Sequence, residues 1–165
     1  MELLRADDEG IARAARALAE GLLVAIPTET VYGLGANAFD TVAVARVFEA
    51  KRRPSFDPLI VHIADLEALD EVASLPNELA ALLMKAFWPG PLTLILPKKK
   101  RVPALVTSGL DTVALRMPSH PVAREVIRRS GVPVAAPSAN PFGYLSPTRA
   151  EHVARMLGHR VDFIL

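Results

Sequence analysis

Three segments of the chain concentrate polar side chains that a hydrophobic core does not require. The first, Pro27–Gly35, follows a short apolar run and contains two threonines, a carboxylate, a tyrosine and two glycines. Glycines allow a backbone to approach a ligand closely, so this segment could form one wall of a binding site. Its Gly33-x-Gly35 spacing imitates a dinucleotide-binding turn. These glycines lie well beyond the apolar run, so we reject that interpretation, and an ordinary strand-to-helix turn remains the alternative.

A second segment places three cations, Lys51, Arg52 and Arg53, directly before Pro54. They could form a solvated helix end, because cations interact favourably with the C-terminal end of a helix dipole. They could instead clamp a polyphosphate, since lysine supplies a point charge and arginine a forked donor. The chain contains no Gly-x-x-x-x-Gly-Lys-Ser/Thr motif. If it binds a nucleotide, Lys51 and Arg53 must therefore replace a glycine-rich phosphate loop.

The third segment, Ala135–Thr148, follows an apolar run and is dense in hydroxyl, amide and turn residues. Ser138 and Asn140 could satisfy the backbone of a turn, or they could donate hydrogen bonds to a phosphate or a ribose. Ser138 is a poor candidate for a nucleophile, because no Gly-x-Ser-x-Gly turn surrounds it. Two further single residues are ambiguous. His62 could be a structural histidine on a strand, and Arg116 could be a surface ion-pair partner or a carboxylate receptor.

Apolar runs and helical patterns alternate along the chain, which predicts an α/β fold. Helices are expected over residues 8–20, 40–50, 76–87, 119–131 and 148–158, with a short one after Asp65. Strands are expected over residues 22–26, 59–63, 92–96, 112–117, 132–136 and 161–165. No helical pattern separates 92–96 from 112–117, so the sheet is expected to be mixed, with both parallel and antiparallel pairs.

Composition limits the classes of protein that fit. The 165 residues predict one domain over 1–165, and a formal net charge of +1 gives no global attraction to nucleic acid or anionic membrane. The absence of cysteine excludes disulfides and thiolate metal sites. No apolar run approaches the length of a membrane span, and the acidic N-terminus does not resemble a secretory signal. We therefore expect a soluble, cytoplasmic protein without a membrane partner. Lys98–Arg101 is expected to be a solvated turn or a contact to an RNA backbone.

Six motifs together resemble the YrdC-type threonylcarbamoyl-AMP synthases, from about Gly10 to Leu165. They are Pro27-Thr-Glu-Thr-Val-Tyr-Gly-Leu-Gly35, Lys51-x-Arg53-Pro54, Pro58-Leu-Ile-Val-His-Ile63, Trp88-Pro-Gly-Pro-Leu-Thr93, Arg116-x-Pro118 and Pro137-Ser-Ala-Asn140. The resemblance implies a twisted mixed sheet with flanking helices and a concave basic face. It implies that Lys51 and Arg53 hold the ATP phosphates, and that the nucleotide also contacts Asp57, Thr112, Ser138, Asn140 and Ser146. It implies that Thr30, His62, Arg116 and Ala136 receive threonine and that Tyr32 shapes the pocket.

The activity implied is the formation of threonylcarbamoyl-AMP and pyrophosphate from L-threonine, bicarbonate and ATP, with Mg²⁺ accompanying ATP. The product would supply tRNA-modifying enzymes that make threonylcarbamoyladenosine. Two alternatives stay open: a non-catalytic module that binds double-stranded RNA or tRNA, and a carbamoyl-transfer module like that of hydrogenase maturation proteins. Family members continue past the last expected strand, so the resemblance also implies that this chain lacks a C-terminal segment of the pocket.

Overall fold

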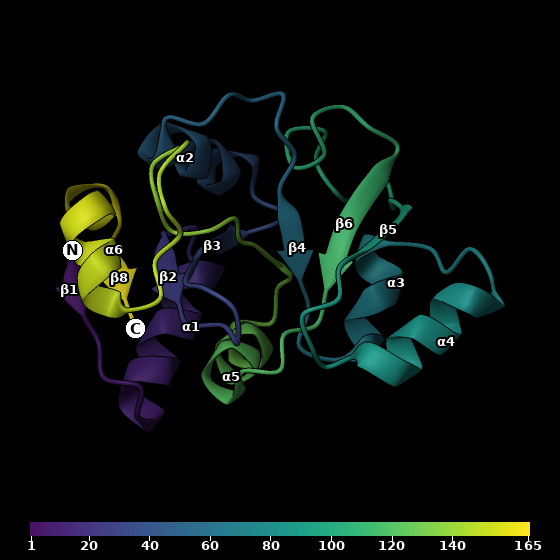
Figure 1. Ribbon diagram of the computed structural model, residues 1–165, viewed down its shortest axis with the longest axis horizontal. Helices are drawn as coiled ribbons and strands as arrows, with labels where there is room; N and C mark the ends of the chain where they lie inside the picture. The colour runs from purple at the N-terminus through teal and green to yellow at the C-terminus, as the bar shows by residue number, and fades with distance from the viewer.

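A single eight-stranded sheet forms the centre of the computed structural model, which describes residues 1–165. The strand order is β1-β8-β2-β3-β7-β4-β6-β5 (Figure 1). The pairs β1/β8, β2/β8 and β4/β6 are parallel and the others are antiparallel. The bounds are β1 Glu2–Leu3, β2 Val24–Ile26, β3 Gly33–Asn37, β4 Ile60–His62, β5 Leu94–Pro97, β6 Thr112–Arg116, β7 Val134–Ala135 and β8 Phe163–Ile164. The expected mixed sheet is therefore confirmed.

Helices cover both faces of the sheet because its strands alternate their apolar side chains between two cores. One core joins α1 and α5 to β2 and β7, through residues such as Leu18, Val24 and Val126. The larger core packs α2, α4 and α6 against the opposite face. The helix bounds are α1 Asp8–Ala19, α2 Thr41–Lys51, η1 Leu66–Ala68, α3 Leu69–Val72, α4 Glu78–Phe87, α5 Pro121–Ser130, α6 Ala150–Leu157 and η2 Gly158–Arg160. In Figure 1, β4 and β6 have no helix in front of them on the face toward the viewer.

Local chemistry explains where several helices begin and end. The side chain of Asp40 accepts hydrogen bonds from the backbone N–H groups of Val42 and Ala43, at 2.9 and 3.2 Å, and so caps α2. Gly131 ends α5 with a φ of 67°, a conformation that glycine adopts without a steric penalty. None of the helices is long and apolar enough to cross a membrane.

Other starts differ from the expectations. The helix expected over 76–87 begins at Glu78, because the side chain of Asn77 caps α4 by accepting a 3.0 Å hydrogen bond from the Ala80 N–H. Asp65 precedes η1 without capping it, because its carboxylate pairs with Arg124 and Arg128 on α5. Thr148 and Glu151 have the spacing of a capping box, but no such box forms, and Arg149 precedes α6 with no side-chain cap.

The largest correction concerns residues 27–37, where the sequence pattern predicts neither a helix nor a strand. Their second half is β3, an interior strand paired with β2 and β7. The glycines have a packing reason there, because a Cβ on Gly35 would lie 3.0 Å from Val134 Cγ1 and 3.1 Å from the carbonyl oxygen of Val24. The close approach at Gly35 is therefore between neighbouring strands. Gly33 alone reaches the cavity described below.

Candidate functional site

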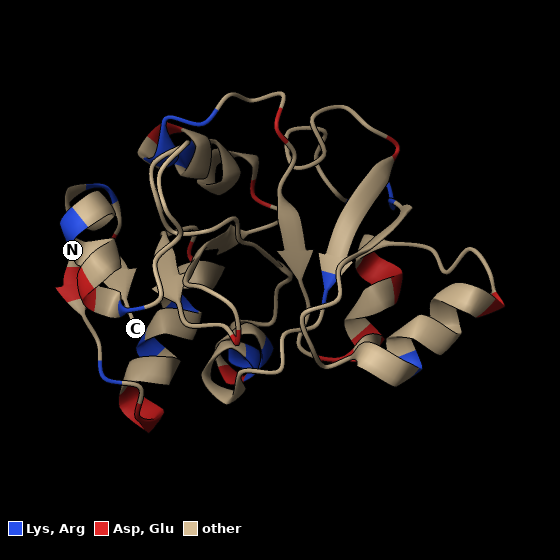
Figure 2. Ribbon diagram, in the orientation of Figure 1, with Lys and Arg blue, Asp and Glu red and all other residues tan.

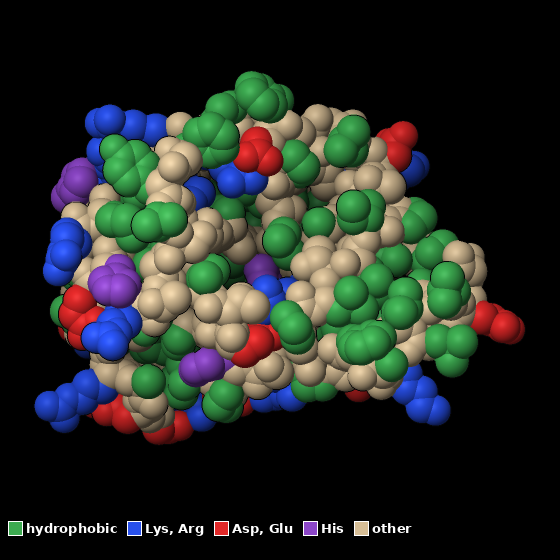
Figure 3. Space-filling view, in the orientation of Figure 1, with side chains coloured by type: hydrophobic (Ala, Val, Ile, Leu, Met, Phe, Trp, Pro, Cys, Tyr) green, Lys and Arg blue, Asp and Glu red, His purple; other side chains and the backbone are tan.

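A cavity of about 280 Å³ lies over the uncovered face of β4 and β6. Pro58, Ile60 and His62 reach it from one side of β4, since alternate residues of a strand share a face. The parallel register pairs Ile60 with Ala114 and His62 with Arg116, which brings the C-terminal ends of both strands together. The lining residues are Thr28, Thr30, Val31, Gly33, Arg53, Pro58, Ile60, His62, Arg116, Ala136, Pro137 and Ser138. Figure 3 shows a hollow near the middle of this face, with cationic and histidine side chains at its floor.

One end of the cavity is built around the guanidinium of Arg116, which is only 7% exposed. Its Nε donates to the carbonyl of Gly90 at 3.2 Å, and both terminal nitrogens lie 3.3 Å from the hydroxyl of Thr30. A carboxylate oxygen of Glu29 lies 2.8 Å from Nη2. A guanidinium fixed in this way presents its remaining N–H groups to a carboxylate in one orientation. This end can receive an amino-acid carboxylate.

His62 lies beside Arg116 and is neutral at ordinary pH. Burial, reinforced by the charge of Arg116, lowers the pKa of His62 to about 4. Its Nδ1 atom is buried without a hydrogen-bond partner. Buried polar atoms are rarely left unpaired in folded proteins, so such an atom at a cavity wall indicates a place for a ligand or an ordered water. A neutral imidazole can donate from one nitrogen and accept at the other.

The other end of the cavity is formed by Arg53, which follows α2. Its Nε donates to the carbonyl of Asp57 at 3.1 Å, and Nη2 lies 3.0 Å from the carbonyl of Pro58 and 2.8 Å from the carboxylate of Asp57. The remaining nitrogen, Nη1, makes no contact of this kind. Asp57 therefore joins the site through Arg53, and the arrangement leaves one donor arm for an anion. Thr112 begins β6 at this same end, two residues before the partner of Ile60.

Lys51 differs from the solvated helix end considered from the sequence, because its side chain is 1% exposed. The ammonium Nζ donates short hydrogen bonds to the carbonyl oxygens of Ser138 and Asn140. The backbone carbonyl of Lys51 also accepts from the N–H of Phe142 at 2.8 Å. Burial, together with the nearby charge of Arg53, lowers the pKa of Lys51 to about 8. Lys51 thus joins the end of α2 to the loop that supplies Ser138.

Lys51, Asp57 and Thr112 do not line the cavity, and neither do three further candidates, Asn140, Ser146 and Tyr32. The amide of Asn140 donates to the carbonyls of Pro141 and Tyr144 at 2.9 and 2.8 Å, so it holds the loop, as one interpretation of the sequence proposed. Ser146 is exposed and lines a separate depression against α6. Tyr32 contributes through its backbone, which donates to Pro147 and accepts from Ala139, each at 2.8 Å. The structure therefore brings Thr30, Arg53, His62, Arg116, Ala136 and Ser138 together, with Lys51 and Asp57 in contact with them.

Glu29 is a residue of this site that the sequence did not single out. Burial raises its pKa, but the contact with Arg116 and backbone N–H groups outweigh that effect, so the net pKa lies below the usual value. It is therefore a carboxylate at neutral pH. The available signal was that Glu29 is the only acidic residue in Pro27–Gly35.

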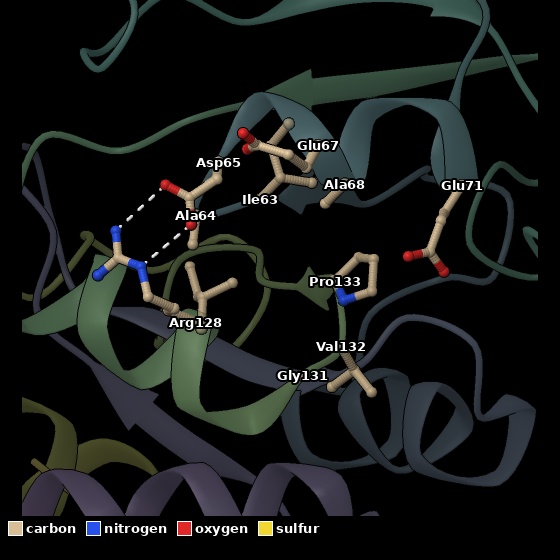
Figure 4. Close-up of a pocket in the computed structure, with 11 residues that line it drawn as sticks. Ile63, Ala64, Asp65, Glu67, Ala68, Glu71, Arg128, Gly131, Val132 and Pro133 are labelled. Atoms are coloured by element: carbon tan, nitrogen blue, oxygen red, sulfur yellow. Dashed lines mark hydrogen bonds and ion pairs between the residues drawn. The ribbon is translucent and has the colours of Figure 1, made fainter.

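A larger cavity, of about 350 Å³, lies elsewhere, between η1–α3 and the end of α5 (Figure 4). Three of its four charged groups are already engaged, because Arg128 pairs with Asp65 and Glu71 pairs with Arg101, while Glu67 has no cationic partner. The rest of the lining is mostly apolar or backbone. The smaller cavity offers the unpaired donors that recognition of a polar ligand requires.

Comparisons with known proteins match almost the whole chain. The model of the Sua5_yciO_yrdC family, described as "Telomere recombination", matches residues 16–165. A threonylcarbamoyl-AMP synthase of Bacillus subtilis is 57% identical over 163 residues, 98% of this chain and 47% of that protein. The enzyme of that name from Vibrio vulnificus is 38% identical over 91% of this chain and 82% of its own length. The chain thus spans about half the length of the first relative.

Solved structures of known proteins also match almost the whole chain. Pyrococcus abyssi Sua5 in complex with L-threonine has a TM-score of 0.94 and 53% identity, over 99% of this chain and 48% of that one. Escherichia coli YciO has a TM-score of 0.85 and 26% identity, over 99% of this chain and 80% of that one. A full-length HypF structure in its phosphate- and nucleotide-bound form has a TM-score of 0.80 and 26% identity, over 94% of this chain and 24% of that one.

Proposed function

The chain belongs to the Sua5/YciO/YrdC family, and on that premise we propose that it forms threonylcarbamoyl-AMP and pyrophosphate from L-threonine, bicarbonate and ATP. The observation that carries this proposal is the two-ended cavity. A fixed arginine and a neutral histidine occupy one end, and Arg53 with one free donor arm occupies the other. Pro58, just before β4, and His62, at its end, are four residues apart, which corresponds to about 13 Å at the rise of a strand. One cavity can therefore hold an amino acid and a phosphate tail side by side.

The reaction divides into two steps that such a cavity suits. The threonine amine attacks bicarbonate, water leaves, and a carbamate forms. A carbamate oxygen then attacks the α-phosphate of ATP, a new phosphorus–oxygen bond forms, and pyrophosphate leaves. The second step depends mainly on positioning the reactants and neutralising phosphate charge. We assign the phosphates to Arg53, with Lys51 contributing its positive charge from beneath the loop that it binds, and the threonine carboxylate to Arg116.

The other assignments follow the ends of the cavity. Ser138, at the wall of the cavity, is assigned to the nucleotide, with Asp57 and Thr112 at the same end. Asn140 and Ser146, which the resemblance also implies for the nucleotide, do not line the cavity and stay predictions. Thr30, His62 and Ala136 are assigned to threonine, with the neutral imidazole of His62 available to its polar groups. No three acidic or histidine side chains are brought together as a metal site. We write Mg²⁺ as part of the substrate MgATP, held by the phosphate oxygens, which are the hard ligands it prefers.

The test is pyrophosphate release from MgATP with each substrate omitted in turn. We expect release only when L-threonine and bicarbonate are both present, and we expect threonylcarbamoyl-AMP in the products by mass spectrometry. L-Serine, which lacks the methyl group, serves as the matched amino-acid control. Release that continues without threonine would contradict the proposal.

A second candidate function, binding of double-stranded RNA or tRNA, is supported by one observation. Six arginines pair with no acidic side chain: Arg5, Arg16, Arg52, Arg149, Arg155 and Arg160. Four of these lie at the end of α2 or along α6 and η2, where Figure 2 shows basic residues at one side of the molecule. A tRNA that receives the threonylcarbamoyl group downstream could contact this side.

A further inference from the structure

Glu29 is placed to act on the site through Arg116. Its carboxylate meets the guanidinium at 2.8 Å, while Glu29 itself does not line the cavity that Arg116 and Thr30 line. Both carboxylate oxygens are shielded from solvent. Glu29 therefore contacts Arg116 without belonging to the lining of the cavity.

The guanidinium of Arg116 contacts three groups. Nε is bound by the carbonyl of Gly90, and Nη2 is held by Glu29. The hydroxyl of Thr30 bridges Nη1 and Nη2 with two long contacts of 3.3 Å. A hydroxyl held so weakly is the group that an incoming carboxylate can displace or share. Nη1 and the edge facing Thr30 are thus the part of Arg116 left for a ligand.

The charge of Glu29 has a second effect. Arg116 is almost completely buried, and a buried charge without a counterion is strongly disfavoured. Glu29 supplies the negative charge that keeps Arg116 in place before any ligand arrives.

We propose that Glu29 is a positioning residue, which holds Arg116 with one edge turned into the cavity so that a single carboxylate can bind there. The inference rests on the proposed function for the identity of that ligand, L-threonine. The loop geometry supports it, because the Thr28 hydroxyl donates to the Val31 carbonyl at 2.6 Å and accepts from the Val31 N–H at 3.2 Å. The residues on either side of Glu29 are thereby held in one turn.

The test uses titration calorimetry with L-threonine and with ATP on Glu29→Gln and Glu29→Ala. We expect Glu29→Ala to weaken threonine binding at least tenfold, and ATP binding by no more than twofold. Glu29→Gln keeps an acceptor oxygen, so its threonine affinity should fall less. The matched control is Glu2→Gln, which breaks the exposed ion pair with Arg13 and should change neither affinity. Unchanged threonine affinity in Glu29→Ala would overturn the inference.

A double variant separates positioning from a direct contact. If Glu29 acts only through Arg116, Glu29→Ala should weaken threonine binding no further when Arg116→Ala is already present. Additive losses in the double variant would mean that Glu29 acts independently of Arg116, which contradicts the inference. Thermal melting of each variant identifies any loss that comes from unfolding, and Glu29→Asp, which keeps the charge, should recover part of the affinity.

A spectroscopic measurement tests whether Glu29 positions Arg116, even if the proposed function is wrong. The Nε–H of Arg116, assigned by its loss in Arg116→Lys, should give a sharp, slowly exchanging proton signal in the unliganded chain. We expect that signal to broaden or vanish in Glu29→Ala and to persist in Glu2→Gln. If the wild type binds no threonine, the proposed function fails, while loss of the signal still supports the positioning role. A signal that persists in Glu29→Ala overturns it.

Discussion

The two arginines of the cavity are held differently, and this difference bears on what each can recognise. Arg116 is surrounded by a carboxylate, a carbonyl and a hydroxyl, so it is fixed before a ligand arrives. Arg53 is held by the backbone and side chain of Asp57, only a few residues away in the chain. A fixed guanidinium favours one planar partner, whereas a locally held one can follow a flexible phosphate tail.

At this scale we predict the effect of Arg53→Ala on ATP binding. Loss of a charge-assisted hydrogen bond should weaken binding by about 1.5–3 kcal/mol, roughly ten- to a hundredfold in the dissociation constant. Titration calorimetry measures this change directly. Arg52→Ala is the matched control, because Arg52 is the adjacent cation, is exposed and does not line the cavity. Equal effects of the two substitutions would remove Arg53 from the phosphate site.

The buried histidine gives a prediction about acid stability. The pKa of His62 is about 4 in the folded chain and about 6.5 in the unfolded chain, so only the unfolded chain takes up a proton between these values. Its contribution to stability is therefore complete above pH 6.5 and is lost as the pH falls toward 4. We expect this loss to be about 2–3 kcal/mol of unfolding free energy by pH 4.5.

Denaturant unfolding at pH 7.5 and pH 4.5 measures the effect. His62→Gln should lose less stability on acidification than the wild type, because it has no imidazole to protonate. His159→Gln, at an exposed position, should behave as the wild type does. The prediction fails if His62→Gln shows the full wild-type loss.

Several residues could be proposed as site candidates from the sequence alone, because their neighbours in the chain mark them. Lys51, Arg53, His62, Arg116 and Ser138 are each marked by residue type and by a nearby strand or helix end. Glu29 could not be found this way, because its partner is 87 positions away and only the register of β4 with β6 brings Arg116 to that edge. The burial of Lys51 likewise could not be predicted, because the carbonyls that surround its ammonium come from a distant loop.

At the scale of elements, α2 and the loop over 137–147 behave as one unit. The ammonium of Lys51 holds two carbonyls of the loop, and the backbone of Lys51 holds the N–H of Phe142. We predict that Lys51→Met loosens this loop, because each buried carbonyl that loses its donor costs about 1–3 kcal/mol. Amide hydrogen exchange should quicken over 137–147 while α5 and β6 keep their protection.

Lys85→Met is the control for this substitution, since Lys85 is exposed on α4. It should leave exchange over 137–147 unchanged. Protection of the loop that is the same in Lys51→Met and the wild type would show that backbone contacts alone hold it.

The elements that the sequence predicted well are those with a strong pattern of their own. The apolar runs of β2, β4 and β6 and the capped helices α1 and α2 lie within a few residues of the expected ranges. β3 was missed because Gly33-Leu-Gly-Ala-Asn37 has little intrinsic strand preference. Its extended form comes from pairing with β2 and β7 on either side, which is tertiary information.

At the scale of the whole molecule, the small net charge conceals an uneven distribution. Four unpaired arginines lie at the end of α2 and along α6 and η2, although the formal total is only +1. Composition could exclude a strong electrostatic field over the whole molecule, but it could not reveal this local cluster of arginines. If RNA binds there, about four phosphate contacts predict a slope of roughly −3 to −4 in log K against log salt.

Filter binding of a tRNA at several salt concentrations measures that slope. The double variant Arg52→Ala/Arg155→Ala should reduce its magnitude by about two, because two fewer phosphates are then neutralised. Arg5→Ala/Arg16→Ala removes two unpaired arginines outside this group and should leave the slope unchanged. An equal change of the salt slope in both double variants would contradict binding at the arginines of α2, α6 and η2.

The tie between Lys51 and its loop uses only main-chain oxygens, which every amino acid possesses. Consequently the identity of residue 138 can change during evolution while the hydrogen bonds from Lys51 that support the loop are kept. The contacts that hold the loop and the side chains that the loop presents can therefore change independently. Such modularity offers one physical route by which a shared architecture can acquire new substrates, with the lysine preserved and the side chains around it exchanged.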